Sequence, residues 1–209
     1  MRKINIIGNV INELYRCFEI LNTDYFEGKL PAPMITIQKQ RPNNLGHFTL
    51  GKVWKSQKEI DNDEISKYEI NINPINLNRP VEEIVHTLQH EMVHYMNKVN
   101  DVKDCNGQIH NKKFKEAAEK VGLFCEKSKQ YGWGFTHSTE EFKKYVSDKI
   151  KPNSEVFEYF RVPGIPKEKK PINKSTFKYI CPECELVVKA KPDKHIKCAD
   201  CDRLMEMEE

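Results

Sequence analysis

One short segment of the chain combines residue types that could carry out hydrolysis, namely His90-Glu91-Met92-Val93-His94. Residues four apart on an α-helix lie one turn apart on nearly the same face, so both imidazoles can reach one metal ion at about 2.0–2.1 Å. Glu91 lies between them, where it could take a proton from a water that the metal activates. The spacing therefore predicts a catalytic zinc bound by His90 and His94, with Glu91 as the general base.

A catalytic zinc needs a third protein ligand and an open position. The longer motif with a glycine and a third histidine shortly after the second histidine is excluded, because Asn97 and Asn100 occupy those positions. We expect His110, at the start of the next helix, to be the third ligand, and Glu116 is the main alternative. The two lie on different faces of one expected helix, so they could not both bind the same ion.

The remaining histidines are weaker candidates. His86 precedes the motif at helical spacing, but it would lie about 12 Å along the axis from the second histidine of the motif, too far to share an ion. We expect it on a polar face or behind the ligands, and we expect His47 and His137 to be ordinary loop or strand residues. The oxyanion stabiliser is not identified by the sequence, and Tyr95, Tyr131 and His137 are candidates.

Four cysteines near the C-terminus form two Cys-x-x-Cys pairs, Cys181 with Cys184 and Cys198 with Cys201. This spacing is typical of a closed tetrahedral structural zinc with Zn–S near 2.3 Å. His195 could replace a thiolate, but the four cysteines already complete the site. The segment is too short to form a core without a metal. We therefore expect a four-cysteine zinc ribbon, and two zinc ions in the chain, one catalytic and one structural.

The elements that must position these side chains follow from periodicity and capping signals. The patterns predict helices over residues 9–27, 80–99, 111–121 and 138–150, and strands over residues 34–37, 45–54 and 68–72. In the second helix the apolar residues form one stripe, and the two histidines of the motif lie roughly opposite it. That helix can therefore pack on the core while its histidines face a cleft.

The order of elements, the His-Glu-Met-Val-His helix and the following His110-Asn111-Lys112-Lys113-Phe114 resemble the SprT-like (Spartan-related) zinc metallopeptidase family over residues 8–125. Supporting segments are Asp24-Tyr25-Phe26, Leu45-Gly46-His47-Phe48 and Glu69-Ile70-Asn71-Ile72-Asn73-Pro74. The resemblance implies an α+β, zincin-like domain with a small antiparallel sheet packed on helices. It also implies a third zinc ligand ahead of a phenylalanine, which maps onto His110 and Phe114. Two positions depart from the family pattern, Tyr95 in place of alanine and Asn111 in place of glycine.

Composition shifts predict three parts: a metallopeptidase domain over residues 1–150, a Pro/Lys-rich linker or extended segment over 151–175, and the ribbon over 176–209. Within the first part, residues 55–66 are polar and are expected to form a turn or loop. The chain has 209 residues, 38% hydrophobic and 31% charged, with a formal net charge of +3. No apolar run approaches the roughly 18 residues that cross a bilayer, and no signal peptide is recognisable. We therefore expect a cytoplasmic protein.

The leading hypothesis is a zinc-dependent endopeptidase, and the resemblance implies substrates that are associated with DNA or crosslinked to it. An edge strand near residues 46–53 could hold a protein or peptide substrate by strand addition. The alternative is a non-enzymatic adaptor that binds nucleic acid or protein through the ribbon and the basic linker. Glu91 argues against the adaptor, because a purely structural zinc site needs no general base.

Overall fold

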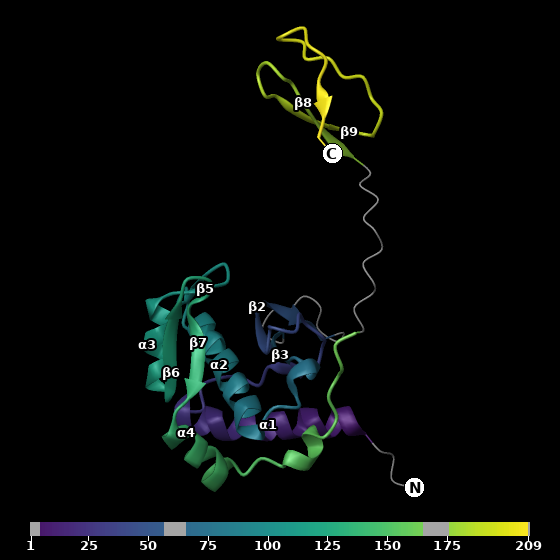
Figure 1. Ribbon diagram of the computed structural model, residues 1–209. Helices are drawn as coiled ribbons and strands as arrows, with labels where there is room; N and C mark the ends of the chain where they lie inside the picture. Colours follow the sequence, from purple (N-terminus) through teal and green to yellow (C-terminus); the bar gives the residue numbers. More distant parts are fainter. Residues whose placement is uncertain (1–4, 57–65, 165–175, 209) are drawn as a thin grey trace. The chain divides into compact units, whose positions relative to one another are not determined.

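In the computed structural model, which describes residues 5–56, 66–164 and 176–208, the His-Glu-x-x-His segment lies on a central helix, α2 (Val81–Val99). The apolar stripe of this helix is fully buried at Ile84, Val85, Leu88 and Met92. Polar residues of α2 are buried as well, because other elements cover the helix on two sides. The sheet that contains β2 and β3 lies on one side, and α3 (Lys112–Lys120) with the β6–β7 hairpin lies on the other (Figure 1). The helix is thus covered on more faces than its single apolar stripe indicates.

The first sheet has the strand order β1-β3-β2, with β1 at Met34–Thr36, β3 at Lys67–Ile72 and β2 at Gly46–Trp54. Strand β1 runs parallel to β3, and β2 runs antiparallel to β3. The expected α+β class is confirmed, but this sheet is mixed and not purely antiparallel. In the sequence β1 is followed by β2 and then by β3. In the sheet β3 lies between the other two strands, so β2 is an edge strand.

Two buried asparagines at the end of β3 hold the loop that leads into β2. Asn71 binds the backbone of Gln38 through both its amide oxygen and its amide nitrogen. Asn73 donates to the carbonyl oxygens of Arg41 and Asn44 and ends β3 by capping a short 3-10 helix, Pro74–Asn76. These bonds give backbone groups of this largely exposed loop fixed partners within the protein. They also fix where β2 begins.

A second sheet has the order β4-β5-β7-β6, built from β4 (Cys105–Asn106), β5 (Ile109–His110), β6 (Leu123–Ser128) and β7 (Gly132–Ser138). Strands β6 and β7 form an antiparallel hairpin, and β5 pairs with β7 in parallel at His110 and Gly132. These strands differ from the prediction, because the sequence pattern placed no strand over residues 105–138. The hairpin matters for the site because it brings residues far along the chain beside α2.

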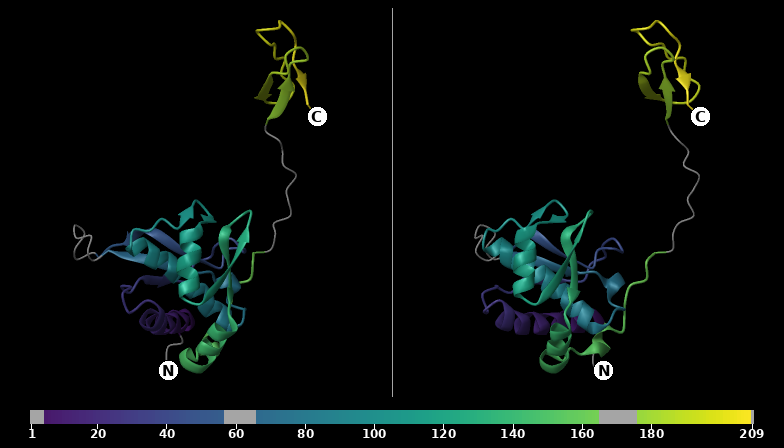
Figure 2. Two further views of the ribbon diagram at one scale, coloured as in Figure 1. Left: turned by 90° about the vertical axis from the view of Figure 1, so that its left-hand side faces the viewer. Right: turned by 60° about the vertical axis from the view of Figure 1, so that its left-hand side comes forward.

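The first and last helices of this part of the chain begin and end close to their predicted positions. Helix α1 (Ile6–Tyr25) begins at a cap formed by Asn5, three residues before the expected start. Helix α4 (Glu140–Tyr145) continues as a π-helical turn, Val146–Ile150, over the predicted range. The views of Figure 2 place α1 and α4 away from the β4–β5 turn.

The chain divides into two compact units, residues 1–163 and 164–209. The short helix Ser154–Phe157 packs with the first unit, because Phe157 is buried in its core and Asn153 donates its backbone N–H to Glu13. Residues 165–175 of the expected linker and 57–65 of the expected polar loop lie outside the described residues. Among the helices that the structure describes, none has both the length and the apolar character needed to cross a bilayer.

The second unit is a three-stranded antiparallel sheet in the order β10-β8-β9. Its strands are β8 (Phe177–Ile180), β9 (Val187–Ala190) and β10 (Glu206–Met207). The buried core consists of Tyr179, Cys181, Cys198 and Met205. Two of these four side chains are cysteines, so the small core surrounds the thiol cluster.

Candidate metal centres

Three imidazoles converge in the first unit. His90 and His94 come from successive turns of α2, and His110 comes from β5, immediately before α3. One ring nitrogen of each lies within 4.8 Å of the others, and the Nε2 atoms of His94 and His110 are 3.0 Å apart. Two nitrogens bound tetrahedrally to zinc at about 2.05 Å would be about 3.3 Å apart, so the spacing fits a shared ion.

The Nδ1 atom of each ring has its own partner. Nδ1 of His94 lies 2.7 Å from Oδ2 of Asp104, and Nδ1 of His110 lies 3.2 Å from the carbonyl oxygen of Tyr131. Because a carboxylate and a carbonyl only accept, both rings carry their proton on Nδ1 when neutral. Their Nε2 lone pairs then face each other at 3.0 Å, an arrangement that a cation between them stabilises. The residues present therefore fit a metal ion.

His90 is held from the opposite side, by β7. Its Nδ1 lies 2.9 Å from Oγ1 of Thr136. Thr136 is on the inner face of the hairpin, in register with the buried Cys125 of β6. The three imidazoles are thus oriented by three separate segments, as second partners commonly orient metal ligands.

Phe114 forms the base of the cluster. It is fully buried, and its ring centroid lies 4.9, 4.6 and 4.5 Å from those of His90, His94 and His110. Its helix, α3, begins at Asn111, whose side chain accepts hydrogen bonds from the N–H groups of Lys113 and Phe114. The departure from glycine at position 111 therefore supplies a helix cap and leaves His110 in the cluster.

A glycine makes room for the third imidazole. A Cβ atom at Gly134 would lie 2.4 Å from Nδ1 of His110, much closer than any ordinary contact. The backbone of β7 can therefore lie against the His110 ring only without a side chain at this position.

Glu91 lies on the β2 side of the cluster. Its carboxylate accepts a hydrogen bond from the backbone N–H of Phe48, and a Cβ atom at Gly46 would lie 2.9 Å from its Oε1. Burial raises the pKa of Glu91 to about 7 in the metal-free protein. The positive charge of a bound metal would lower it again, toward the carboxylate that a base requires.

Burial favours the neutral, ligating form of His90 and His110. Burial, followed by the charges of His94 and His110, lowers the pKa of His90 well below its ordinary value. Burial also lowers the pKa of His110 to about 4. Burial raises the pKa of Asp104, but the hydrogen bond and charge of His94, together with hydrogen bonds from Asn97 and Cys105, outweigh it and hold that pKa below the usual range. Asp104 is thus held as an anion beside Nδ1 of His94.

The other candidates lie elsewhere. Glu116 is exposed on α3, and no group of clustered metal-binding side chains among the described residues includes it. His86 is buried against Phe142, with its Nδ1 4.0 Å from a carboxylate oxygen of Glu83. His47 is an exposed residue of β2, as expected for a strand position.

Two of the three oxyanion candidates are directed away from the cluster. The hydroxyl of Tyr95 donates to the carbonyl oxygen of Pro31, and its ring stacks on Phe48 in the core. His137 follows Thr136 in β7, so it lies on the opposite face of the hairpin, where it pairs with Glu126. Tyr131 contacts His110 through its carbonyl oxygen, and a catalytic role for its hydroxyl stays a prediction.

The four cysteines of the second unit also converge. One sulfur of each lies within 4.8 Å of the others, and the sulfurs of Cys184 and Cys198 are 3.7 Å apart. Sulfurs bound tetrahedrally at about 2.3 Å from zinc would be about 3.8 Å apart, whereas a disulfide needs about 2.05 Å. The spacing therefore fits a metal and not a disulfide.

The two Cys-x-x-Cys segments have the same backbone geometry. The N–H of Cys181 donates to the carbonyl of Leu186, and that of Cys198 donates to the carbonyl of Arg203. The residue after each second cysteine, Glu185 or Asp202, has a positive φ. Each segment thus forms one knuckle of the same kind. His195, the possible substitute for a thiolate, is exposed and lies outside the cysteine cluster.

Three residues that contact the clustered histidines were not predicted from the sequence: Asp104, Thr136 and Gly134. No spacing rule relates them to the His-Glu-x-x-His segment, because they reach the histidines only through the loop before β5 and through the hairpin. The one available signal is the chemistry of Asp104, a carboxylate in the loop between the second and third ligands.

Comparison with protein-family models matches residues 14–131 to the SprT-like family. The match spans more than half of the chain and includes the three clustered histidines and Glu91. A search of curated proteins finds no match.

Proposed function

Because the chain belongs to the SprT-like family, we propose that it is a zinc-dependent endopeptidase whose catalytic residue is Glu91. The observation that carries the proposal is the convergence of His90, His94 and His110, each with its Nδ1 held by another residue, next to a buried carboxylate. A structural zinc site would be closed by a fourth protein ligand and would need no base beside it.

Zinc bound by the three Nε2 atoms would polarise the scissile carbonyl and make a water acidic near neutral pH. Glu91 would take the proton of the attacking water, hold it on its carboxylate and pass it to the leaving amine. Burial assists the second half of this sequence, because it favours the protonated carboxyl group. The hydrogen bond from the Phe48 N–H orients the carboxylate on the β2 side of the histidine cluster.

Strand β2 is the proposed substrate-binding edge. It lies at the edge of its sheet, and its first residue, Gly46, packs against Glu91. An extended peptide paired to this edge would run past the catalytic carboxylate. Backbone pairing of this kind binds many sequences, which suits a peptidase that recognises the shape of an unfolded segment.

We propose that the substrates are proteins associated with DNA or crosslinked to it. The support is the family resemblance together with the basic segment 151–175, which holds six Lys and Arg against three Asp and Glu. The ribbon segment 176–209 holds six against eight, and four thiolates with one Zn²⁺ would add further negative charge. The charge distribution thus favours the segment before the ribbon, and not the ribbon itself, as a contact with phosphates.

The decisive experiment measures cleavage of an unfolded protein by the wild type, Glu91→Gln and Glu116→Gln. Removal of a general base typically lowers kcat by about 10²–10⁴. We expect that loss for Glu91→Gln, with both zinc ions retained, and near wild-type cleavage for Glu116→Gln, which changes an exposed carboxylate of α3. Equal cleavage by the wild type and Glu91→Gln would contradict the proposal. A wild type that binds DNA tightly but cleaves nothing would support the adaptor.

A further inference from the structure

A second group of potential metal ligands lies on the other side of the His94 ring. One donor atom each of His94, Asp104 and Cys105 lies within 4.8 Å of the others. Nδ1 of His94 is 2.7 Å from Oδ2 of Asp104, and the thiol of Cys105 donates a hydrogen bond to the same carboxylate. A nitrogen, an oxygen and a sulfur therefore converge on the Nδ1 side of the ring, whereas His110 lies on its Nε2 side.

The β4–β5 hairpin explains why a thiol lies at this point. Its register sets Cys105 directly opposite His110, and side chains of directly opposed residues project from the same face. Cys105 is only partly buried, and residues 106–109 of the turn that follows it are exposed, so an ion can reach it from solvent. Cys17 and Cys125 are buried, and neither belongs to a group of clustered metal-binding side chains in the part of the chain that the structure describes.

The three donors need only a small adjustment to hold an ion. Nitrogen and oxygen donors bound tetrahedrally at about 2.05 Å are about 3.3 Å apart, so Nδ1 and the carboxylate, now at 2.7 Å, must separate by about 0.6 Å. Asn97 donates to the same carboxylate oxygen at 3.0 Å and can keep Asp104 in place when the ion takes over its contact with His94. A water molecule would complete a tetrahedron.

The donor set selects the class of cation. Thiolate and imidazole ligands favour soft and borderline ions, whereas Mg²⁺ and Ca²⁺ favour oxygen. Burial, followed by the charge of Asp104, raises the pKa of Cys105 to about 12, so a cation must bind sulfur strongly to displace the thiol proton. Thiophilic divalent cations, such as Cd²⁺ or zinc in excess, meet this requirement.

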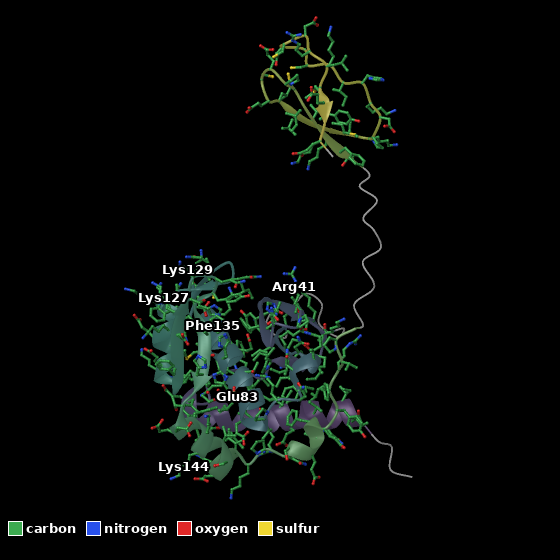
Figure 3. The ribbon with its side chains drawn as sticks, in the orientation of Figure 1. Arg41, Glu83, Lys127, Lys129, Phe135 and Lys144 are labelled. Atoms are coloured by element: carbon green, nitrogen blue, oxygen red, sulfur yellow. The ribbon has the colours of Figure 1, made fainter. Side chains whose placement is uncertain are left out.

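The surrounding charge acts in the same direction. Residues 102–135 hold seven Lys against four Asp and Glu. Figure 3 shows two of these lysines, Lys127 and Lys129, at the end of the unit where the N–H of His110 joins β5 to the carbonyl oxygen of Tyr131 in the hairpin turn. These ammonium groups repel cations that are held only by charge, so binding depends on the affinity for sulfur.

We propose that His94, Asp104 and Cys105 form an inhibitory site for a thiophilic divalent cation, and that an ion bound there excludes the catalytic zinc. The ion binds Nδ1 of His94, the ring proton moves to Nε2, and the thiol proton of Cys105 leaves to solvent. The new Nε2–H donates to Nε2 of His110, 3.0 Å away, whose own proton is held on Nδ1 by the carbonyl of Tyr131. The lone pair of His94 that zinc needs is then occupied by a proton.

The two ions are exclusive because each needs a different tautomer of one imidazole. The regulatory meaning of the site rests on the proposed function, since the excluded ion is the zinc of the peptidase. Binding itself does not rest on it.

The first test uses cadmium NMR of the zinc-loaded chain, because the chemical shift of cadmium rises with the number of bound sulfurs. In the wild type we expect a resonance from a site with one sulfur besides that of the four-cysteine ribbon. Cys105→Ala should lose the one-sulfur resonance and keep that of the ribbon. The matched control, Cys125→Ala, removes a thiol outside the clusters and should keep both. A wild type with only ribbon and nitrogen-bound cadmium would show simple replacement of zinc at the histidines and would overturn the proposal.

The second test measures exclusion by elemental analysis of the desalted protein. Cadmium should release one more zinc per chain from the wild type and Cys125→Ala than from Cys105→Ala. Cys105→Ser can still donate to Asp104, so it separates the loss of a ligand from the loss of a hydrogen bond, and it should behave as Cys105→Ala does. Equal zinc release from the wild type and both Cys105 variants would contradict the proposal, as would a one-sulfur resonance in a wild type that keeps zinc at its histidines.

Cleavage of an unfolded protein separates this inference from the proposed function. With each rate expressed relative to the same protein without cadmium, inhibition of Cys105→Ser should need roughly tenfold more cadmium than inhibition of the wild type, because a thiolate ligand is lost. A wild type that cleaves but lacks the one-sulfur cadmium site would sink this inference alone. One-sulfur binding with zinc release, in a chain that cleaves nothing, would sink the peptidase alone.

Discussion

The Nδ1–H of His94 donates to the carboxylate of Asp104 at 2.7 Å, and this bond links the helix that bears the motif to the loop that leads to His110. Asn97, one turn further along α2, donates to the same carboxylate oxygen at 3.0 Å. The carbonyl of Asp104 in turn accepts the N–H of Asn111, the cap of α3. Asp104 therefore orients His94 directly and ties the segment that follows His110 to α2.

The first prediction concerns Asp104→Asn. An amide of the same shape can present its NH₂ to His94, which would move the ring proton to Nε2 and block the metal. We expect the affinity of the histidine site for zinc to fall by about 10–100-fold, while the ribbon keeps its ion. Competition with a chromophoric chelator measures both sites.

The matched control for this change is Asp101→Asn. Asp101 is an exposed residue of the preceding turn with a φ of 54°, a conformation that asparagine accepts readily. It should bind zinc like the wild type. An unchanged zinc affinity in Asp104→Asn would mean that the carboxylate does not set the tautomer of His94.

The second prediction concerns Gly134→Ala. The added Cβ would lie 2.4 Å from Nδ1 of His110, so the imidazole must move or β7 must separate from it. A displacement of about 1 Å in a catalytic group can cost about 10² in rate. We expect a loss of that order in proteolysis, together with weaker zinc binding at the histidine site.

Gly164→Ala is the control, because its new Cβ would have no described atom within 4 Å apart from its chain neighbours, and the position lies outside β2. It should keep wild-type zinc content and activity. Elemental analysis after dialysis gives the zinc content of both variants. A fully active, fully loaded Gly134→Ala protein would show that β7 does not constrain His110.

The third prediction separates the two metal sites. Cys184→Ser removes one of four converging sulfurs from a unit whose small core is built around them. We expect the variant to lose one zinc and the ordered structure of the ribbon, because binding of a structural zinc is also folding free energy. The histidine site should keep its zinc.

The control is Cys125→Ala, at a buried cysteine of β6, which should retain both ions. Metal analysis with NMR of the ribbon resonances decides between these outcomes, and a ribbon that stays folded without its zinc would contradict the prediction.

The sequence predicted the elements whose signal is local. The single apolar stripe of α2 identified that helix. The two Cys-x-x-Cys pairs identified the cysteine cluster for the same reason, since a few consecutive residues determine each knuckle.

The β6–β7 hairpin has no comparable signal. Leu123 and Cys125 are its buried alternating residues, and Phe124, Trp133 and Phe135 favour a strand, but charged residues follow Cys125 and two glycines interrupt β7, so the alternating pattern is too short to stand out. The hairpin forms because α3 and α2 offer it an apolar surface, which is a tertiary effect. The sequence therefore could not predict that Thr136 and Gly134 lie beside the histidines, whereas the histidines themselves were recognised by their spacing.

The fourth prediction concerns the buried His86, whose Nε2 has no hydrogen-bond partner among the described residues. Burial, followed by the charges of Arg79 and His137, lowers its pKa from 6.5 to about 4. Between these values the unfolded chain binds a proton that the folded chain excludes, so stability is fully present above about pH 6.5 and is lost as pH falls toward about 4. From about pH 7.5 to about pH 5 this group alone should cost about 2 kcal/mol of unfolding free energy.

His86→Phe removes the titration and keeps a ring against Phe142. Over the same pH range its urea-unfolding free energy should therefore fall by about 2 kcal/mol less than that of the wild type. His195→Gln, in the ribbon, should follow the wild type, and equal pH dependence in all three proteins would show that His86 is not buried in its neutral form.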